Sequence, residues 1–217
     1  RRVLFRSTFT CSDKFLKLAQ NKAKELKAPW QFHLSESIYE VDHCLKNYGK
    51  LPVKYLEHLG LLDKDVLASQ CVKVKEEEIK ILKERDVKVV HMPLSNCEVG
   101  GGFAPIPDLL DAGVEVALGT DGYINDFFAV MKSAFLLHKA VKEDASVMSA
   151  SIVFKMATEY GAKALGWKNT GKLVSGNKAD FIIMENNFKT PVTLDNIFDQ
   201  IVVQGEKEFI DSVYING

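Results

Sequence analysis

His33 and Glu36 stand three residues apart in the stretch PWQFHLSES, directly after the apolar run that ends at Phe32. An imidazole is a suitable ligand for a divalent metal, and a nearby glutamate that does not bind the metal can move protons. Each residue also has a simpler interpretation. A single histidine at a strand end is more often a hydrogen-bonded structural group, and Glu36 suits the start of a helix, where a carboxylate favours the helix dipole.

Two later stretches also place polar residues after apolar runs. His91 is followed by MPLSN, and Asp121 follows VEVAL in the stretch VEVALGTDG. A histidine and an aspartate on different strand ends can bind one cation, and water bound to such a cation loses a proton near neutral pH, which is hydrolytic chemistry. The alternatives are again structural, because Asp121 followed by glycine is also a common turn pair and His91 suits a structural role.

Strand-like and helix-like segments alternate around these residues. Short apolar runs typical of strands cover residues 30–34, 66–74, 87–93 and 114–122, with segments of helical spacing between them. Strand then helix, four times over, predicts a parallel sheet with helices outside it. Since a full (β/α)₈ barrel takes about 250 residues, residues 29–145 predict either half a barrel or a small open α/β sheet. Reactive groups in such folds collect where strands end.

The pattern changes at both ends of this α/β part. After Trp167, residues 171–185 and 201–217 predict short strands separated by Gly and Asn turns, and hence a small β module. At the other end, residues 1–7 (RRVLFRS) show no link to the pattern that follows. We therefore treat them as a foreign segment, such as a sequencing scar, and expect no strand there.

Composition excludes several partners. Of the 217 residues, 47% are hydrophobic, which is enough for one sizeable core. Lys plus Arg (28) balances Asp plus Glu (29), so the chain has no electrostatic reason to bind nucleic acid or anionic lipid. No apolar stretch approaches the roughly 18 residues of a membrane span. The four cysteines lack C-x-x-C spacing and are typical of reduced thiols in a cytoplasmic protein.

Taken in order, HLSES, HMPLSN, ALGTDG and GKLVSGNKADFIIME resemble the amidohydrolase superfamily. The resemblance runs from about Thr8 to Gly217. It is to the branch that holds the S-adenosylhomocysteine and methylthioadenosine deaminases, the triazine chlorohydrolases and the SsnA-type aminohydrolases. It implies an α/β fold: the C-terminal half of a (β/α)₈ TIM-type barrel in residues 8–166, strands five to eight, followed by part of a small β-sandwich in residues 167–217.

The resemblance also implies an activity and a role for individual residues. The activity is metal-dependent hydrolysis of a non-peptide C–N or C–Cl bond, usually deamination of a heterocyclic or nucleoside-like small molecule. His33 would bind the metal, Glu36 would shuttle protons, and Asp121 would bind the metal and take a proton from the attacking water. Gln70 and His91 would lie beside the substrate. The cofactor would be one divalent metal, zinc or iron, and members of this branch often pair into homodimers.

The sequence departs from the family pattern in two places. The family carries an H-x-H pair of metal ligands on its first barrel strand, and this sequence starts too late to contain it. We therefore expect a fragment, inactive in isolation, of a protein that supplies those ligands upstream. The family also has a histidine in AHC at the end of strand six, where this sequence reads ASQC, with Gln70 in its place. Glutamine donates and accepts hydrogen bonds but carries no charge.

Two alternatives to the enzyme stay open. One is a non-catalytic relative that uses the fold for binding or assembly, with Gln70 as the mark of lost chemistry. The other is an unrelated α/β hydrolase or small-molecule binder, which predicts that Glu36 and Asp121 lie far apart.

Overall fold

A computed structural model describes residues 3–122 and 125–217, and these form two compact units. The first unit consists of the chain up to His91 together with Asn96–Ala117. The second unit consists of Met92–Ser95 together with Leu118–Gly217. The first unit alternates strands and helices along the chain: β1 (Val3–Ser7), α1 (Asp13–Glu25), β2 (Trp30–Leu34), α2 (Ile38–Tyr48), α3 (Pro52–His58), β3 (Val66–Gln70), α4 (Glu76–Glu84), β4 (Lys88–His91) and α6 (Ile106–Asp111). Two further elements cross between the units, namely α5 (Pro93–Glu98) and β5 (Val116–Leu118).

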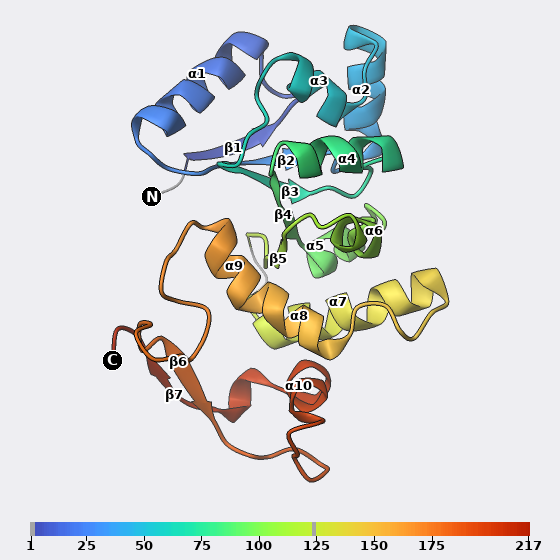
Figure 1. Ribbon diagram of the computed structural model, residues 1–217. Coiled ribbons are helices and arrows are strands. Elements are labelled where there is room, and N and C mark those ends of the chain that lie inside the picture. Colours follow the sequence, from blue (N-terminus) through green and yellow to red (C-terminus); the bar gives the residue numbers. More distant parts are fainter. Residues whose placement is uncertain (1–2, 123–124) are drawn as a thin grey trace. The chain divides into compact units, whose positions relative to one another are not determined.

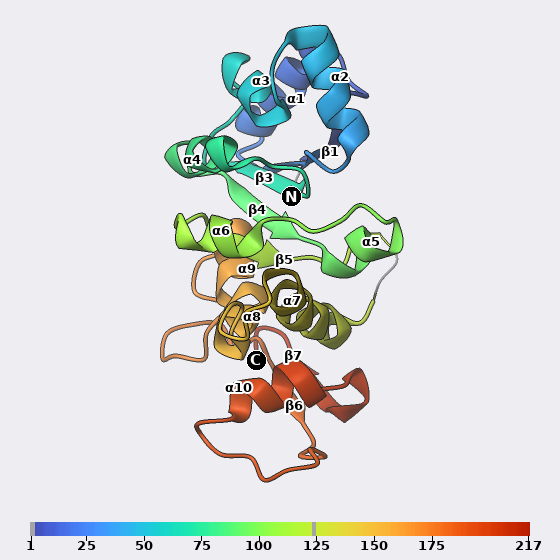
Figure 2. The ribbon, with the colours of Figure 1, turned by 90° about the vertical axis from the view of Figure 1, so that its right-hand side faces the viewer.

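The strands form one five-stranded sheet in the order β1-β2-β3-β4-β5, in which β1 to β4 pair parallel. This confirms the parallel α/β sheet and the four predicted strands. Helices α1 to α4 lie on one face of the strands (Figure 1 and Figure 2). The core sits between these two layers, because Trp30, Phe32 and Leu34 alternate along β2 with at most 1% of their surface exposed.

Local signals fix the helix ends of this unit. Ser12 caps α1 by accepting a hydrogen bond from the Phe15 amide, as its position before the helical pattern predicts. Gly49 ends α2 with a φ of 63°, a left-handed conformation that glycine adopts without strain. Helix α5 was not expected from the sequence, which suggested only that MPLSN follows a strand.

The expectation that residues 1–7 have no place in the fold is wrong for Val3–Ser7. These residues form β1 and pair parallel with β2, with Val3 opposite Trp30 and Ser7 opposite His33. The sheet therefore has five strands where the sequence predicts four. The segment lacks a strong apolar alternation, and its strand conformation comes from pairing with β2, a contact that the local sequence does not reveal.

The second unit carries α7 (Phe127–Lys142), α8 (Ala150–Ala157), α9 (Glu159–Ala164), α10 (Ile197–Asp199), the π-helix η1 (Gln200–Gln204), the 3₁₀-helix η2 (Lys207–Phe209) and the two-stranded antiparallel sheet of β6 (Phe181–Met184) and β7 (Ile210–Tyr214). Helix α7 packs against α8 and η1, which buries Phe128, Val153, Met156 and Val202. Strands β6 and β7 are joined by stacked rings of Phe181 and Tyr214.

Two predictions for the second unit are wrong in detail. The segment around residues 149–167 predicts one helix, but Thr158 separates α8 from α9 because its hydroxyl donates to the Phe154 carbonyl at 2.8 Å and competes with the helix bonds. Residues 201–204 predict a strand but belong to η1. Their helical form buries Val202 beside α7, and it needs glycine at 205, where a Cβ would lie 2.7 Å from the Phe128 ring.

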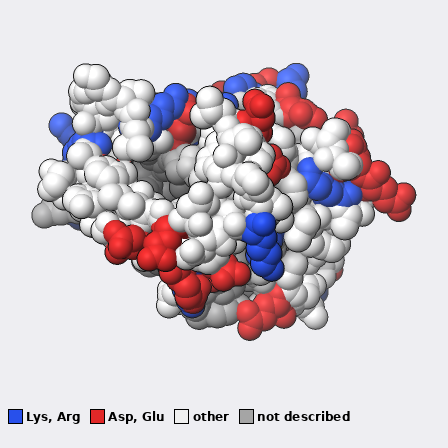
Figure 3. Space-filling view, turned by 90° about the horizontal axis from the view of Figure 1, so that it is seen from below, with Lys and Arg blue, Asp and Glu red and all other residues white. Residues whose placement is uncertain are grey.

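Lys and Arg side chains occur in small separate groups among acidic and uncharged residues on the face shown in Figure 3. This mixture matches the near balance of 28 basic and 29 acidic residues in the chain. Within the described ranges, no helix combines the length and the apolar character that crossing a bilayer requires.

Candidate active site

Polar side chains mark the face of the sheet opposite the buried side chains of β2. Gln31 and His33 alternate with Trp30, Phe32 and Leu34, so they lie on the other face of β2. His33 is in register with Ser69 of β3, and Gln31 donates to the Ser69 hydroxyl at 2.6 Å. The sequence thus places His33 at the carboxyl end of a parallel strand, on a face that the helices α1–α4 leave uncovered (Figure 1).

His33 and Glu36 lie together at the end of β2. The His33 Nδ1 atom is 3.9 Å from Glu36 Oε2, and the two side chains are 25% and 29% exposed. The same Nδ1 is buried and has no hydrogen-bond partner among the described residues, since 3.9 Å is beyond hydrogen-bonding distance. The imidazole therefore remains open to a further ligand, while Glu36 reaches partly into solvent, as a group that exchanges protons must.

The backbone is strained where the strands end. Left-handed φ values occur at Ser35 after β2 (50°), at Gln70, the last residue of β3 (76°), at Cys71 directly after it (53°), and at Asp121 after β5 (61°). Each costs roughly 1–2 kcal/mol for a residue with a Cβ. Two of these four residues, Gln70 and Asp121, are predicted site residues. Left-handed φ values also occur away from the strand ends, for example at Lys27, Asp86 and Glu143, so the strain alone does not mark a functional site.

Gln70 and His91 end β3 and β4, the strands next along the sheet, and both are buried, at 0% and 1% exposure. Cys71, beside Gln70, is also fully buried, and burial raises the pKa of its thiol. The thiol therefore stays protonated and is a poor nucleophile. All four cysteines of the chain are free thiols.

Asp121 belongs to the second unit and is held at both carboxylate oxygens. The Ser95 hydroxyl donates to Oδ2 at 2.6 Å, and the Gly122 amide donates to Oδ1 at 2.8 Å. Both partners lie in the same unit as Asp121. Ser95 is therefore a site residue that the sequence did not identify, although the stretch HMPLSN contains it. The convergence of His33 and Asp121 on one cation stays a prediction.

Glu40 is a second residue that the sequence did not identify. It lies on α2, four residues after Glu36, which precedes that helix. Its side chain is fully buried, and this burial raises the pKa of its carboxyl. It contacts Thr8 and the backbone of Glu36. A glutamate near the start of a helix is an ordinary helix residue in sequence, so only the structure distinguishes it.

The donor set fits a divalent metal in part. An imidazole nitrogen and a carboxylate oxygen are ligands that zinc and iron accept. The buried His33 Nδ1 without a hydrogen-bond partner and the oriented Asp121 carboxylate suit that role. No cluster of three or more His, Cys, Asp or Glu placed to hold a metal occurs within residues 3–122 and 125–217. His33 and Asp121 alone leave such a metal short of its usual three protein ligands.

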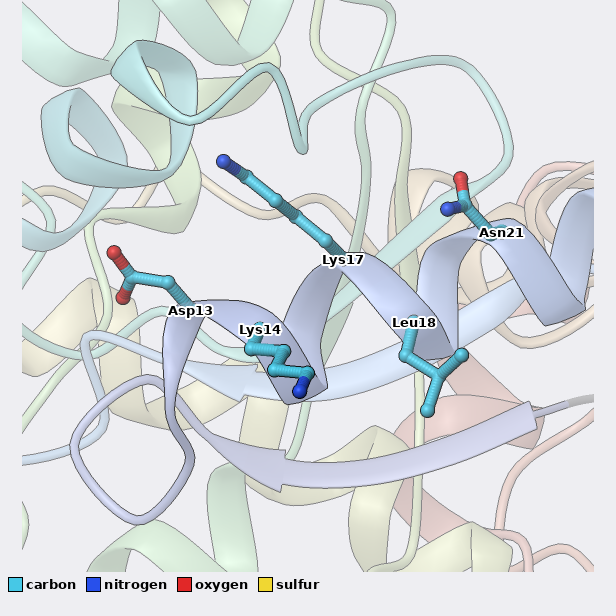
Figure 4. Close-up of a pocket in the computed structure, with 5 residues that line it drawn as sticks. All are labelled: Asp13, Lys14, Lys17, Leu18 and Asn21. Carbon is cyan, nitrogen blue, oxygen red and sulfur yellow. The ribbon is translucent and has the colours of Figure 1, made fainter.

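A hollow of about 480 Å³ lies elsewhere, on α1 (Figure 4). All five lining side chains project from that one helix: Asp13, Lys14, Lys17, Leu18 and Asn21. None of them is a predicted site residue, so this hollow does not coincide with the strand-end site.

The parallel α/β sheet, with an imidazole and carboxylates at or after the carboxyl ends of its strands, defines a class of fold that carries its reactive groups at this edge. Comparison with known proteins gives the family. The protein-family model described as "Amidohydrolase family" matches residues 3–217, and the chain belongs to this family. This finding confirms the resemblance and extends the match to Val3–Ser7.

Three relatives illustrate the similarity. The chain is 40% identical to the 5-methylthioadenosine/S-adenosylhomocysteine deaminase of Thermococcus sibiricus and 38% identical to that of Aquifex aeolicus, covering 96% of this chain in both cases and 50% and 49% of the relatives. An adenosine deaminase from Xanthomonas campestris, solved with bound zinc, is 30% identical with a TM-score of 0.92, covering 99% of this chain and 50% of that one. The chain thus spans about half the length of the curated relatives it matches.

Proposed function

We propose that this chain supplies the proton-transfer carboxylates and part of the metal site of a hydrolase that deaminates a heterocyclic, nucleoside-like small molecule. One observation carries the proposal: His33 and Glu36 lie 3.9 Å apart at one strand end of a chain that belongs to the amidohydrolase family. The named activity of its relatives, deamination of adenosine-type compounds, supports the substrate class. Because the chain spans about half of those relatives, we propose the activity for a longer protein of which this chain would form one half.

Each carboxylate has a separate task in this proposal. Glu36 is partly exposed and would donate its proton to a ring nitrogen, then take the proton of the newly added hydroxyl and pass it to the leaving amine, which departs as ammonia. The proton that Asp121 takes from water would then return Glu36 to its protonated starting state. Asp121 accepts a proton from the attacking water, for which its hydrogen bonds to Ser95 and Gly122 keep the carboxylate oriented. Gln70 and His91 line the substrate side of the strand ends. Gln70 donates and accepts hydrogen bonds there but cannot relay a charge.

His33 and Asp121 would hold one divalent cation, zinc or iron. When bound, the cation supplies Lewis acidity that lowers the pKa of water toward neutrality. The remaining ligands would come from an H-x-H pair in the half of the protein outside this chain. The bound zinc of the similar adenosine deaminase supports the choice of metal.

The same comparison supports a proposal for the architecture. Strands β1–β5 would be the last five strands of a (β/α)₈ barrel, one more than the sequence predicted. The two-stranded sheet of β6 and β7 leaves Ile182 and Val213 exposed at 45% and 60%. We propose that strands from the other half of the protein cover these side chains and complete a small β-sandwich in residues 167–217.

Metal analysis and an ammonia-release assay on the full-length protein test the proposed function. We expect about one zinc or iron per chain and release of ammonia from a panel of purine nucleosides. His33→Ala should lose the metal, whereas His58→Ala, which removes an exposed histidine on α3, should keep it. Glu36→Gln should keep the metal and lose turnover by about a hundredfold or more, the usual contribution of a general acid or base. A folded, metal-free wild-type protein would refute the assignment.

Gln70 favours one alternative, a non-catalytic relative that binds a ligand with the same fold. In that case the wild-type protein binds nucleosides without releasing ammonia, and Gln70→His does not create activity. If Gln70 only changes the substrate preference, Gln70→His instead shifts activity among the nucleosides of the panel.

A further inference from the structure

Glu40 is a buried carboxylate that accepts hydrogen bonds from two separate segments. One oxygen accepts the hydroxyl of Thr8, which follows β1, and the other accepts the backbone N–H of Glu36 at 2.9 Å. Its side chain is fully buried. Burying a carboxylate is costly unless its oxygens are paired, and here the pairing partners connect β1, α2 and the loop after β2.

The loop that carries Glu36 is held at several points. The Ser35 carbonyl accepts the Lys73 amide at 2.7 Å from the loop after β3, and Ser35 itself adopts a left-handed φ of 50°. The next peptide N–H, that of Glu36, is the one held by Glu40. Ser37 then caps α2 by accepting the Glu40 amide at 3.4 Å. Glu40 therefore fixes the strained backbone from which the Glu36 side chain projects.

Helix capping alone is the competing explanation, and the chain contains a suitable comparison. Glu78, on α4, is also fully buried, and its two oxygens accept the backbone amides of Val53 at 2.8 Å and Lys75 at 3.1 Å. Like Glu40, it is the third residue after a helix N-cap. Unlike Glu40, it holds no segment that contains a predicted site residue. The two glutamates therefore match in burial and in position on their helices, and they differ in their donors. Glu78 accepts the amide of its own N-cap residue, Lys75, whereas Glu40 accepts the amide of Glu36, one residue before its N-cap.

We propose that Glu40 is a positioning residue, which with Thr8 fixes the backbone of Glu36 and so sets the placement of the proton-transferring carboxylate. This inference rests on the proposed function of Glu36. It assigns to Glu40 a role in turnover beyond its contribution to stability.

Three substitutions in the full-length protein separate the two explanations. Glu40→Met keeps the length of the side chain but leaves the Glu36 amide without this acceptor and the Thr8 hydroxyl with only the weak contact to Cys44 Sγ at 3.9 Å. Glu40→Gln preserves both bonds, because the amide oxygen can accept from Glu36 while the amide nitrogen donates to a Thr8 hydroxyl that has turned round. Glu78→Met is the matched control, since it removes the acceptor of two backbone amides, those of Val53 on α3 and of Lys75 at the N-cap of α4.

The positioning role predicts a specific pattern. Relative to Glu78→Met, Glu40→Met should lower kcat by about tenfold or more with a much smaller change in KM, because a misplaced catalytic group slows the chemical step. Glu40→Gln should restore most of the lost kcat. Amide hydrogen exchange provides a readout that does not depend on turnover. The Glu36 N–H should exchange about tenfold faster in Glu40→Met than in the wild type, and at the wild-type rate in Glu78→Met.

The inference is overturned if Glu40→Met and Glu78→Met have the same kcat, or if the Glu36 amide stays protected in Glu40→Met. If Glu40→Met does not fold, Glu40→Asp with Glu78→Asp as its control repeats the comparison, because a carboxylate one methylene shorter cannot reach both donors. The proposed function fails separately, if Glu36→Gln retains full activity; hydrogen exchange would still report whether Glu40 holds the loop.

Discussion

The hydrogen bond from Ser95 to Asp121 leads to a quantitative prediction. At 2.6 Å it is a short hydroxyl-to-carboxylate bond, and hydrogen bonds to charged groups contribute about 1.5–3 kcal/mol. Asp121 is only partly buried and keeps the Gly122 amide on its other oxygen at 2.8 Å. We therefore take the lower end of that range, about 1.5 kcal/mol, which corresponds to about tenfold in an equilibrium constant.

Ser95→Ala in the full-length protein should accordingly weaken zinc binding by about tenfold, as expected when a partner that orients a metal ligand is removed. Titration against a competing chelator measures this affinity. The matched control is Ser212→Ala, because the Ser212 hydroxyl donates to the Asp211 carboxylate at 2.8 Å on the exposed strand β7. A Ser95→Ala protein that binds zinc within about twofold of the wild type would show that Ser95 does not orient a metal ligand.

Three further predictions concern stability and thiol reactivity. Burial raises the pKa of the Glu78 carboxyl above its ordinary 4.5. Its protonated form therefore stabilises the fold below pH 4.5, and this contribution is lost as the pH rises through the raised pKa. In urea unfolding at several pH values, the free energy of unfolding should fall less with rising pH for Glu78→Gln than for the wild type. The exposed Cys97 should react quickly with a thiol reagent, and Cys71, whose pKa is raised by burial, only after unfolding. Gly205→Ala should lower the free energy of unfolding by about 2 kcal/mol through overpacking, since a Cβ there would lie 2.7 Å from the Phe128 ring; an unchanged urea midpoint would contradict this.

The sequence predicted the sheet well where a mostly apolar run lies between segments of helical spacing. The strands β2, β3, β4 and β5 were located because buried parallel strands consist of nearly continuous apolar runs. Strand β1 was missed because Val3–Ser7 stands apart from the alternating pattern that follows, and its place in the sheet is set by pairing with β2. The π-helix η1 was missed for a related reason, since its apolar residues suit a strand equally well and packing against α7 decides between the two.

The candidate site shows the same division between local and tertiary information. His33 and Glu36 were found because they are close in sequence and their residue types carry known chemistry. Ser95 and Glu40 were not, because nothing in a lone serine or in a glutamate near a helix start indicates the partner that it will meet. Thr8 and Glu40 are 32 positions apart, and Ser95 and Asp121 are 26 apart. Groups that orient a site are therefore harder to predict than the groups that they orient.

The two predicted proton-transfer carboxylates are each oriented by partners in their own unit. The Glu36 backbone is held by Glu40 and Thr8 within the first unit, and the Asp121 side chain by Ser95 within the second. Preorganised groups perform proton transfer without reorganising during the reaction, and that preorganisation is already built into each unit separately. The local surroundings that the proposed proton transfer needs are therefore present within each unit alone.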